Sequence, residues 1–301
     1  MKTQKIHGLV AAPFTPFQSD GSLNLPVIEK QAEFLVSRGV AGAFVCGTTG
    51  EGPSLTLSER QQVAERWIQI AGDSLCVIVH AGHASQADSI ALAAHAQKAG
   101  AVGVSILAPY FFKPRAVSDL VDFCVPIAAA APEIPFYYYH IPSITGGGLS
   151  MYDFLVEAAP RIPNLAGIKF THEDLVEYSA CLRFEDGRFD LLFGRDEILL
   201  PGLVLGAKGA VGSTYNYMPQ IYRRLIEAFD KGDFAAARAL QAQATDIIGV
   251  MIRHGGLPAG KAMMAMAGVD CGPVRAPLRK LDATQRAALQ KDLESFEFPF
   301  T

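Results

Sequence analysis

The sequence has little that would mark an extracellular or membrane protein. Its five cysteines, Cys46, Cys76, Cys124, Cys181 and Cys271, are scattered and form no C-x-x-C pair, which argues against a disulfide framework and a zinc knuckle. We expect buried, reduced thiols. No run approaches the ~18 consecutive apolar residues of a membrane span, and the apolar part of MKTQKIHGLVAAP is too short for a signal peptide. These absences predict a cytoplasmic protein with no membrane partner.

The sequence also lacks an excess of positive charge. Its formal net charge is -4 and its pI is near 6.0, so no long-range basic field would attract a phosphate backbone or anionic lipid. We therefore expect no nucleic-acid partner. Apolar residues, in contrast, make up 50% of the 301 positions, which suits a protein that buries roughly three quarters of its unfolded surface.

Short apolar runs alternate with longer segments of helical period. Each run is almost continuously apolar, as expected for strands that are covered on both faces. Amphipathic stretches such as LSERQQVAERWIQIAG lie between the runs, and Ser58 and Gln61 predict a capping box at the head of this one. The eight runs are HGLVAA, AGAFVCG, LCVIVHAG, VGVSILAP, IPFYYYH, LAGIKF, FDLLFG and KGAVGS.

Eight repeats of strand and helix predict an α/β fold of the (β/α)8 TIM-barrel type, because no glycine fingerprint of an open dinucleotide-binding sheet follows the first run. Beyond residue 230 the strand signals stop and three helical stretches follow, FAAARALQAQATDIIGVMIRH, PAGKAMMAMAG and ATQRAALQKDLESF. No linker rich in Pro, Gly or Ser separates them from the barrel. We expect a catalytic barrel over residues 1–230 and a C-terminal helical extension over residues 231–301, packed together as one unit.

Active sites of such barrels lie at the C-terminal ends of the strands, and the sixth run ends in Lys169. Side chains alternate along a strand, so Leu165, Gly167 and Lys169 should share one face, and Ala166 and Ile168 the other. If Ile168 faces the helices, Lys169 points into the barrel mouth. Desolvation that lowers a lysine pKa to about 7 to 8 yields a nucleophile able to form a Schiff base with a ketone. Alternatively, the side chain extends to water or pairs with a carboxylate.

The fifth run ends in FYYYHIPSITGG. Tyr139 is the last tyrosine before the chain breaks at Pro142, so its hydroxyl can reach the space above the barrel and pass a proton to and from a substrate oxygen. Packing is an equally good interpretation for Tyr139. For Tyr137 and Tyr138 packing is the better one.

After the second run comes GTTGEG, at residues 47–52. Its glycines let backbone N–H groups converge on an anion, and Thr48 and Thr49 add side-chain donors. The segment lacks the lysine of a Walker loop, so a small carboxylate fits better than a nucleotide. A tight turn without a ligand is the alternative.

Polar residues also follow the seventh and eighth runs. Asp196 and Glu197 either complement a helix dipole or hold the hydroxyls of a polyol, and Ser213 supplies a hydroxyl donor or an N-cap. His80 and His83 in HAGH could suggest a metal, but no third ligand is near them in the sequence. A lone histidine pair is usually structural, so we expect no metal.

Three of these motifs together resemble the pyruvate-dependent lyase and synthase superfamily that includes dihydrodipicolinate synthases and N-acetylneuraminate lyases. They are the GTTGE loop, a tyrosine followed by x-I-P, and G-I-K, and the resemblance runs from about residue 5 to residue 298. Dihydrodipicolinate synthases carry an arginine in P-S-R-T-G, whereas this chain has Ile144, which cannot replace a guanidinium. GTTGEGPSLTLSERQQVAERW, PFYYYHIPSITG, FGRDE and GAVGSTYNYM closely resemble N-acetylneuraminate lyases, particularly the vertebrate-like group.

The resemblance implies a class I aldolase that reversibly cleaves N-acetylneuraminate to N-acetylmannosamine and pyruvate without a metal or organic cofactor. Lys169 would form the Schiff base, Tyr139 would assist proton transfer at the C4 hydroxyl, and Thr48 and Thr49 would hold the pyruvyl carboxylate. The polyhydroxylated tail would meet Thr171, Gly194, Asp196, Glu197 and Ser213.

The resemblance also implies a homotetramer. Many members have two successive tyrosines where this chain has Tyr110 and Phe111, so a proton relay between subunits is not expected there, and Tyr110 is left with packing or a subunit contact. Three alternatives stay open: a related lyase or dehydratase acting on a different 2-keto-3-deoxy sugar acid, a zinc-dependent aldolase using His80 and His83, and a sensor that binds a keto acid without turnover.

Overall fold

The computed structural model describes residues 5–298. Eight short parallel strands form a closed barrel, in which neighbours pair in chain order and β8 closes onto β1. This confirms the predicted TIM barrel and all eight strand runs. The strands are β1 (Gly8–Ala11), β2 (Gly42–Val45), β3 (Cys76–His80), β4 (Gly103–Leu107), β5 (Phe136–His140), β6 (Leu165–Phe170), β7 (Asp190–Phe193) and β8 (Gly209–Gly212).

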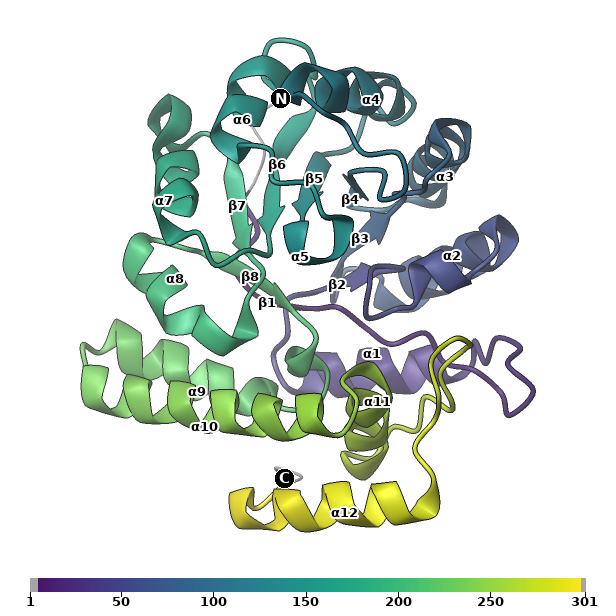
Figure 1. The fold of residues 1–301 in the computed structure, drawn as a ribbon, viewed down its shortest axis with the longest axis vertical. Coiled ribbons are helices and arrows are strands. Elements are labelled where there is room, and N and C mark those ends of the chain that lie inside the picture. Colours follow the sequence, from purple (N-terminus) through teal and green to yellow (C-terminus); the bar gives the residue numbers. More distant parts are fainter. Residues whose placement is uncertain (1–4, 299–301) are drawn as a thin grey trace.

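Helices surround the strands, as Figure 1 shows. A single helical turn, α5 (Pro142–Thr145), follows β5, and short 3-10 turns follow β7 and β8, named η3 (Asp196–Ile198) and η4 (Thr214–Asn216). The remaining helices of the barrel are α1 (Val27–Ser37), α2 (Leu57–Ala71), α3 (Gln86–Ala99), α4 (Val117–Ala129), α6 (Met151–Ala158), α7 (Leu175–Arg183), α8 (Leu199–Leu205) and α9 (Pro219–Asp230).

The N-terminus of α2 departs from the sequence prediction. The capping box is formed by Thr56, whose hydroxyl accepts from the Glu59 N–H, and by the Glu59 carboxylate, which accepts from the Thr56 N–H. The predicted box of Ser58 and Gln61 is wrong, because Ser58 already lies inside the helix, which begins at Leu57. Both pairs have the spacing of a capping box, and only the backbone turn decides between them.

Two apolar clusters form the core. The smaller one fills the barrel and includes Val10, Phe44, Tyr137 and Tyr139, whereas the larger one lies between strands and helices and includes Tyr138. The predicted alternation of the three tyrosines along β5 is therefore confirmed. Packing also accounts for Tyr138, as its ring centroid lies 4.7 Å from that of Phe154.

Near the start of β6 the register against β5 shifts by one residue. Ala166 joins the cluster inside the barrel, while Leu165 and Ile168 join the outer one. The predicted faces of Leu165 and Ala166 are therefore wrong, because an extra residue in one strand breaks strict alternation. From Ile168 onward the alternation resumes. Ile168 faces the helices, so the prediction that Lys169 points inward is confirmed.

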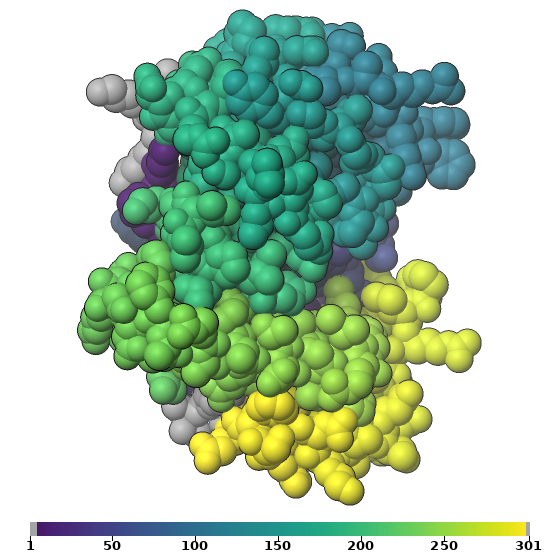
Figure 2. Space-filling model, turned by 60° about the vertical axis from the view of Figure 1, so that its left-hand side comes forward, coloured from purple at the N-terminus to yellow at the C-terminus, as the bar shows by residue number. Residues whose placement is uncertain are grey.

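The three helices predicted for the C-terminal extension are present. They are α10 (Phe234–Arg253), α11 (Leu257–Met266) and α12 (Ala283–Leu293). α10 packs on α9 and α8 of the barrel, and α11 and α12 pack on α10. The extension occupies one side of the molecule in Figure 1, and in Figure 2 its green to yellow surface continues directly into that of the barrel.

We propose that the barrel and the extension fold as one unit. One apolar cluster contains Leu9 of β1, Ile247 of α10 and Leu289 of α12, which supports a shared core. Residues 1–4 and 299–301 of the two predicted segments lie outside the described residues.

The cysteines largely agree with the expectation of buried thiols. All five cysteines are free thiols, of which four are buried and Cys76 is half-buried. In the part of the chain that the structure describes, no helix combines the length and apolarity needed to cross a membrane.

A matched pair of substitutions on α10 tests the single unit. Ile247 is fully buried, whereas Ile252 is 59% exposed. We expect Ile247→Ala to lower the free energy of unfolding by about 2 to 5 kcal/mol in one cooperative denaturant transition, and Ile252→Ala to change it by less than about 0.5 kcal/mol. Two separate transitions, or equal effects of the two variants, would show that the extension unfolds independently.

Candidate active site

A cavity of about 170 Å³ lies at the C-terminal ends of the barrel strands. Its lining comes from the loop after β2, from the ends of β5 and β6, and from the turns after β7 and β8. The structure brings together every site residue predicted from the sequence. These residues are Lys169, Tyr139, Thr48, Thr49, Thr171, Gly194, Asp196, Glu197 and Ser213.

The amine of Lys169 is held among aromatic rings. Its Nζ atom lies 4.1 Å from the ring centroid of Phe44 and 4.0 Å from that of Tyr139, and the residue is only 4% exposed. Burial lowers the pKa of Lys169 to about 7, against the smaller opposing effect of the Asp196 charge. Within residues 5–298 it forms no ion pair. The amine thus neither reaches open water nor pairs with a carboxylate, and near neutral pH a large fraction is uncharged.

Tyr139 lies beside this amine. Its hydroxyl oxygen is 3.5 Å from Oγ1 of Thr48, and either atom can donate. Burial raises the pKa of Tyr139, so the phenol is neutral at physiological pH. A neutral phenol both donates and accepts a hydrogen bond. The hydroxyl is therefore suited to passing a proton between two oxygen atoms. The ring also packs against Phe44, with 5.5 Å between the ring centroids, so the position is compatible with both interpretations of Tyr139.

The two histidines of HAGH lie in different places. His80 is buried inside the barrel, with its ring centroid 5.6 Å from that of Tyr139, and burial lowers its pKa well below the ordinary value. His83 lies outside, with Nδ1 3.4 Å from a carboxylate oxygen of Asp88. Among the described residues, no three His, Cys, Asp or Glu side chains gather as a metal-binding group.

The loop GTTGEG is closed by its own backbone. The Glu51 N–H donates to the Thr48 carbonyl at 3.0 Å, and the Gly52 N–H donates to the Gly47 carbonyl at 3.0 Å. Thr48 is exposed and Thr49 is half-buried. Both threonines line the cavity, so their hydroxyls are placed to bind a small anion beside Lys169.

Asp196 joins the turns that follow β7 and β8. Its carboxylate accepts from the Thr214 N–H at 3.0 Å and from the Thr214 hydroxyl at 2.6 Å. Burial raises the pKa of Asp196 to about 6. Glu197, in contrast, is half-buried and has its Oε2 3.7 Å from Nε of Arg195. Asp196 is thus largely engaged by the protein, while Glu197 is less buried and also lines the cavity.

Two glycines of the cavity permit close approach. A Cβ atom on Gly194 would lie 2.0 Å from Oγ1 of Thr171, and one on Gly212 would lie 2.0 Å from Oδ1 of Asp196. Any other residue would displace these polar atoms. The predicted place of Gly194 therefore has a structural reason.

Helix α10 of the extension supports the site from outside the barrel. The Gln241 amide donates to the carbonyls of Asp196 and Glu197 at 3.1 and 2.9 Å, and the Thr245 hydroxyl donates to the Glu197 carbonyl at 3.0 Å. One and two turns further along, Ile248 and Met251 line the cavity. The extension therefore belongs to the site.

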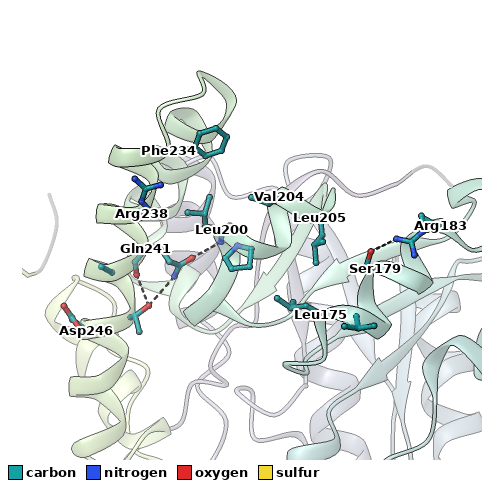
Figure 3. A pocket seen from close by; sticks show the side chains of 14 residues that line it. Leu175, Ser179, Arg183, Leu200, Val204, Leu205, Phe234, Arg238, Gln241 and Asp246 are labelled. Atoms are coloured by element: carbon teal, nitrogen blue, oxygen red, sulfur yellow. Dashed lines mark hydrogen bonds between the residues drawn. The ribbon is translucent and has the colours of Figure 1, made fainter.

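A larger hollow of about 1080 Å³ lies between α7, α8 and α10 (Figure 3). It contains none of the predicted site residues. Its walls are mainly apolar, and Gln241 and Thr245 are among the polar residues that line it. The chemistry is thus concentrated in the smaller cavity.

Several residues of the smaller cavity were not predicted. Gly212 and Thr214 are the sequence neighbours of Ser213, so the prediction of Ser213 could have been extended to them. Ile248 and Met251 have apolar spacing on a helix, but nothing in the sequence says which face meets the barrel mouth. The residues not predicted are Ala12, Ile141, Arg195, Val211, Gly212, Thr214, Ile248 and Met251.

Comparison with known proteins agrees with this geometry. The model of the "Dihydrodipicolinate synthetase family" matches residues 5–296. The chain belongs to this family. Among its members, N-acetylneuraminate lyase of Rattus norvegicus is 43% identical over 98% of this chain and 94% of its own length, and that of Homo sapiens is 41% identical over the same shares. The solved N-acetylneuraminate lyase of Proteus mirabilis superposes with a TM-score of 0.96 at 44% identity, covering 98% of this chain and 100% of that one.

The pKa of Lys169 gives this family member a testable pH profile. Only the uncharged amine reacts with an electrophile, so labelling of Lys169 by an acylating reagent should reach half its maximum near pH 7. Exposed lysines should continue to gain reactivity up to about pH 10. Peptide mass spectrometry after brief labelling at each pH measures both. A Lys169 profile that follows the exposed lysines would contradict the desolvated amine.

Proposed function

We propose that this protein is an N-acetylneuraminate lyase that cleaves its substrate reversibly to N-acetylmannosamine and pyruvate. The observation that carries the proposal is the unpaired, desolvated amine of Lys169 at the barrel mouth. The named relatives supply the substrate, since lyases of that name share 41 to 43% of their residues with this chain. They favour this substrate over another 2-keto-3-deoxy sugar acid.

Lys169 would begin the reaction. Its uncharged amine attacks the C2 ketone of the open-chain sugar acid, water leaves, and an iminium forms. Thr48 and Thr49 would hold the neighbouring carboxylate by their hydroxyls, which fixes the ketone against the amine. An iminium accepts an electron pair far better than a neutral ketone, so the bond between C3 and C4 becomes breakable.

Tyr139 would remove the proton of the C4 hydroxyl. As the C4 hydroxyl loses its proton, the O–H electrons form the new aldehyde, and the C3–C4 electrons pass to C3 and then to the iminium nitrogen. Because burial raises the pKa of Tyr139, a free phenolate is disfavoured. We infer that the phenol accepts the C4 proton while donating its own to the substrate carboxylate near Thr48, so no net charge develops on the ring.

The remaining predicted residues would bind the tail of the sugar. Glu197, Thr171 and Ser213 all line the cavity, so a carboxylate and two hydroxyls are available to bind the hydroxyls of the tail. Asp196 would act mainly by holding Thr214 and the turn after β8. This division separates the chemistry at Lys169 from recognition of the polyol.

Two further properties are proposed. The resemblance implies a homotetramer, and Phe111 and Phe112, which are 76% and 84% exposed in the single chain, support a subunit contact. Light scattering that gives the mass of one chain would contradict the homotetramer.

The five free thiols support a reducing compartment and so the cytoplasm. Cell fractionation tests this localisation.

The proposed nucleophile can be tested by substitution and by trapping. We expect wild-type protein to release pyruvate from N-acetylneuraminate, and pyruvate with borohydride to leave a reduced pyruvyl group on Lys169. Lys169→Ala should remain folded and lose about 10^4-fold or more in kcat, whereas Lys208→Ala, an exposed lysine before β8, should behave as wild type. Absence of pyruvate release at millimolar substrate, or label on another lysine, would refute the proposal.

The division of roles predicts a selective effect at Glu197. Glu197→Ala should raise the KM for N-acetylneuraminate about tenfold or more, the typical effect of one lost hydrogen bond to a charged group. Trapping of pyruvate on Lys169 should be unchanged, because pyruvate has no tail. The two assays on the same preparation measure this, and equal losses in both would assign Glu197 to the carbon-carbon cleavage instead.

A further inference from the structure

A buried ion pair connects the extension to the GTTGEG loop. Nζ of Lys261, on α11, lies 2.9 Å from Oε1 of Glu51, and the two side chains are only 3% and 2% exposed. Figure 1 shows α11 close to the segment that follows β1. Neither residue lines the cavity. Charges are rarely kept this deep unless the structure around them is fully paired.

The ammonium group has three polar neighbours. Besides Glu51, Nζ of Lys261 donates to the carbonyls of Thr15 and Pro273 at 2.8 and 2.7 Å. An ammonium has three donors; the two carbonyls accept from two of them, and Glu51 is held as an ion pair. The second oxygen of Glu51 accepts from the Arg275 N–H at 2.8 Å. Such a buried network of ion pair and hydrogen bonds restrains its members to one geometry.

The network reaches the loop by two routes. Glu51 is itself a loop residue, two positions after Thr49, and has a left-handed backbone with φ 54°, which a non-glycine residue keeps only when its surroundings impose it. The second route passes through Thr15, whose carbonyl bonds Lys261 and whose hydroxyl donates to the Gly50 carbonyl at 2.6 Å. Lys261 therefore fixes the backbone on which Thr48 and Thr49 stand.

We propose that Glu51 and Lys261 are positioning residues that set the affinity of the site for the substrate carboxylate. They act through the conformation of the Thr48–Thr49 loop and do not touch the substrate. This inference rests on the proposed role of Thr48 and Thr49. A positioning role affects the binding of one functional group of the substrate, the carboxylate. A purely stabilising role would not single out that group.

Two ketones distinguish these roles. Pyruvate has the carboxylate, whereas methyl pyruvate has the same ketone without the charge. Borohydride trapping on Lys169 gives the concentration of each ketone needed for half-maximal labelling. We expect Glu51→Gln and Lys261→Met to raise this concentration for pyruvate about tenfold, equivalent to one weakened contact, and for methyl pyruvate by less than about twofold.

Two more variants complete the design. Thr15→Val keeps the volume of the side chain and removes only the hydroxyl bond to Gly50. It should raise the concentration for half-maximal labelling by a smaller factor, and for pyruvate alone. This variant tests the inference even if the ion-pair variants fail to fold. Asp190→Asn is the matched control. This buried carboxylate accepts from the Tyr137 hydroxyl and the Ile6 N–H at the opposite end of the barrel. Its loss should lower the stability of the protein without changing the ratio of the half-maximal labelling concentrations of the two ketones.

The outcomes separate the inference from the proposed function. If wild-type protein traps no pyruvate, the proposed function is wrong and the inference falls with it. Suppose instead that wild-type protein traps pyruvate, but neither the ion-pair variants nor Thr15→Val change the ratio of the half-maximal labelling concentrations of pyruvate and methyl pyruvate. The ion pair then has only a stabilising role. A selective loss of pyruvate affinity that Asp190→Asn does not share supports positioning.

Discussion

The exclusion of water from one amine is the constraint on which the site depends. Lys169 lies between the rings of Phe44 and Tyr139 and has no carboxylate partner in the described chain. An ammonium in such surroundings loses hydration that the rings only partly replace, so the uncharged form becomes accessible near pH 7. A salt bridge at this position would have stabilised the charge and removed the nucleophile.

The closed barrel makes this arrangement possible. Phe44, Tyr139 and Lys169 come from β2, β5 and β6, and a closed sheet directs their inward side chains to one axis. The shifted register at the start of β6 matters here, since bulges commonly redirect side chains beside active sites. Ala166 takes the inward place below Lys169 and joins the same interior cluster as Tyr137 and Tyr139 of β5.

The fold and much of the site could be predicted because the relevant signals are local. Apolar runs of strand length, glycine at helix ends and polar residues at strand ends identified the barrel and seven residues of the cavity, and the family resemblance added Thr171 and Gly194. Strict alternation failed at Ala166, because pairing with β5 decides the register. Phe44, Gln241, Ile248 and Met251 went unnoticed for a similar reason: each is an ordinary residue of its element, and only distant packing gives it a place near the amine.

One face of helix α10 has two roles. Gln241 and Thr245 hold the backbone of Asp196 and Glu197, while Ile248 and Met251 form part of the cavity wall. The nucleophile, in contrast, belongs to the barrel. The polyol side of the cavity is therefore shaped jointly by a C-terminal helix and a barrel turn, so that α10 and residues 195–197 would have to be exchanged together to transplant a sugar preference between homologues.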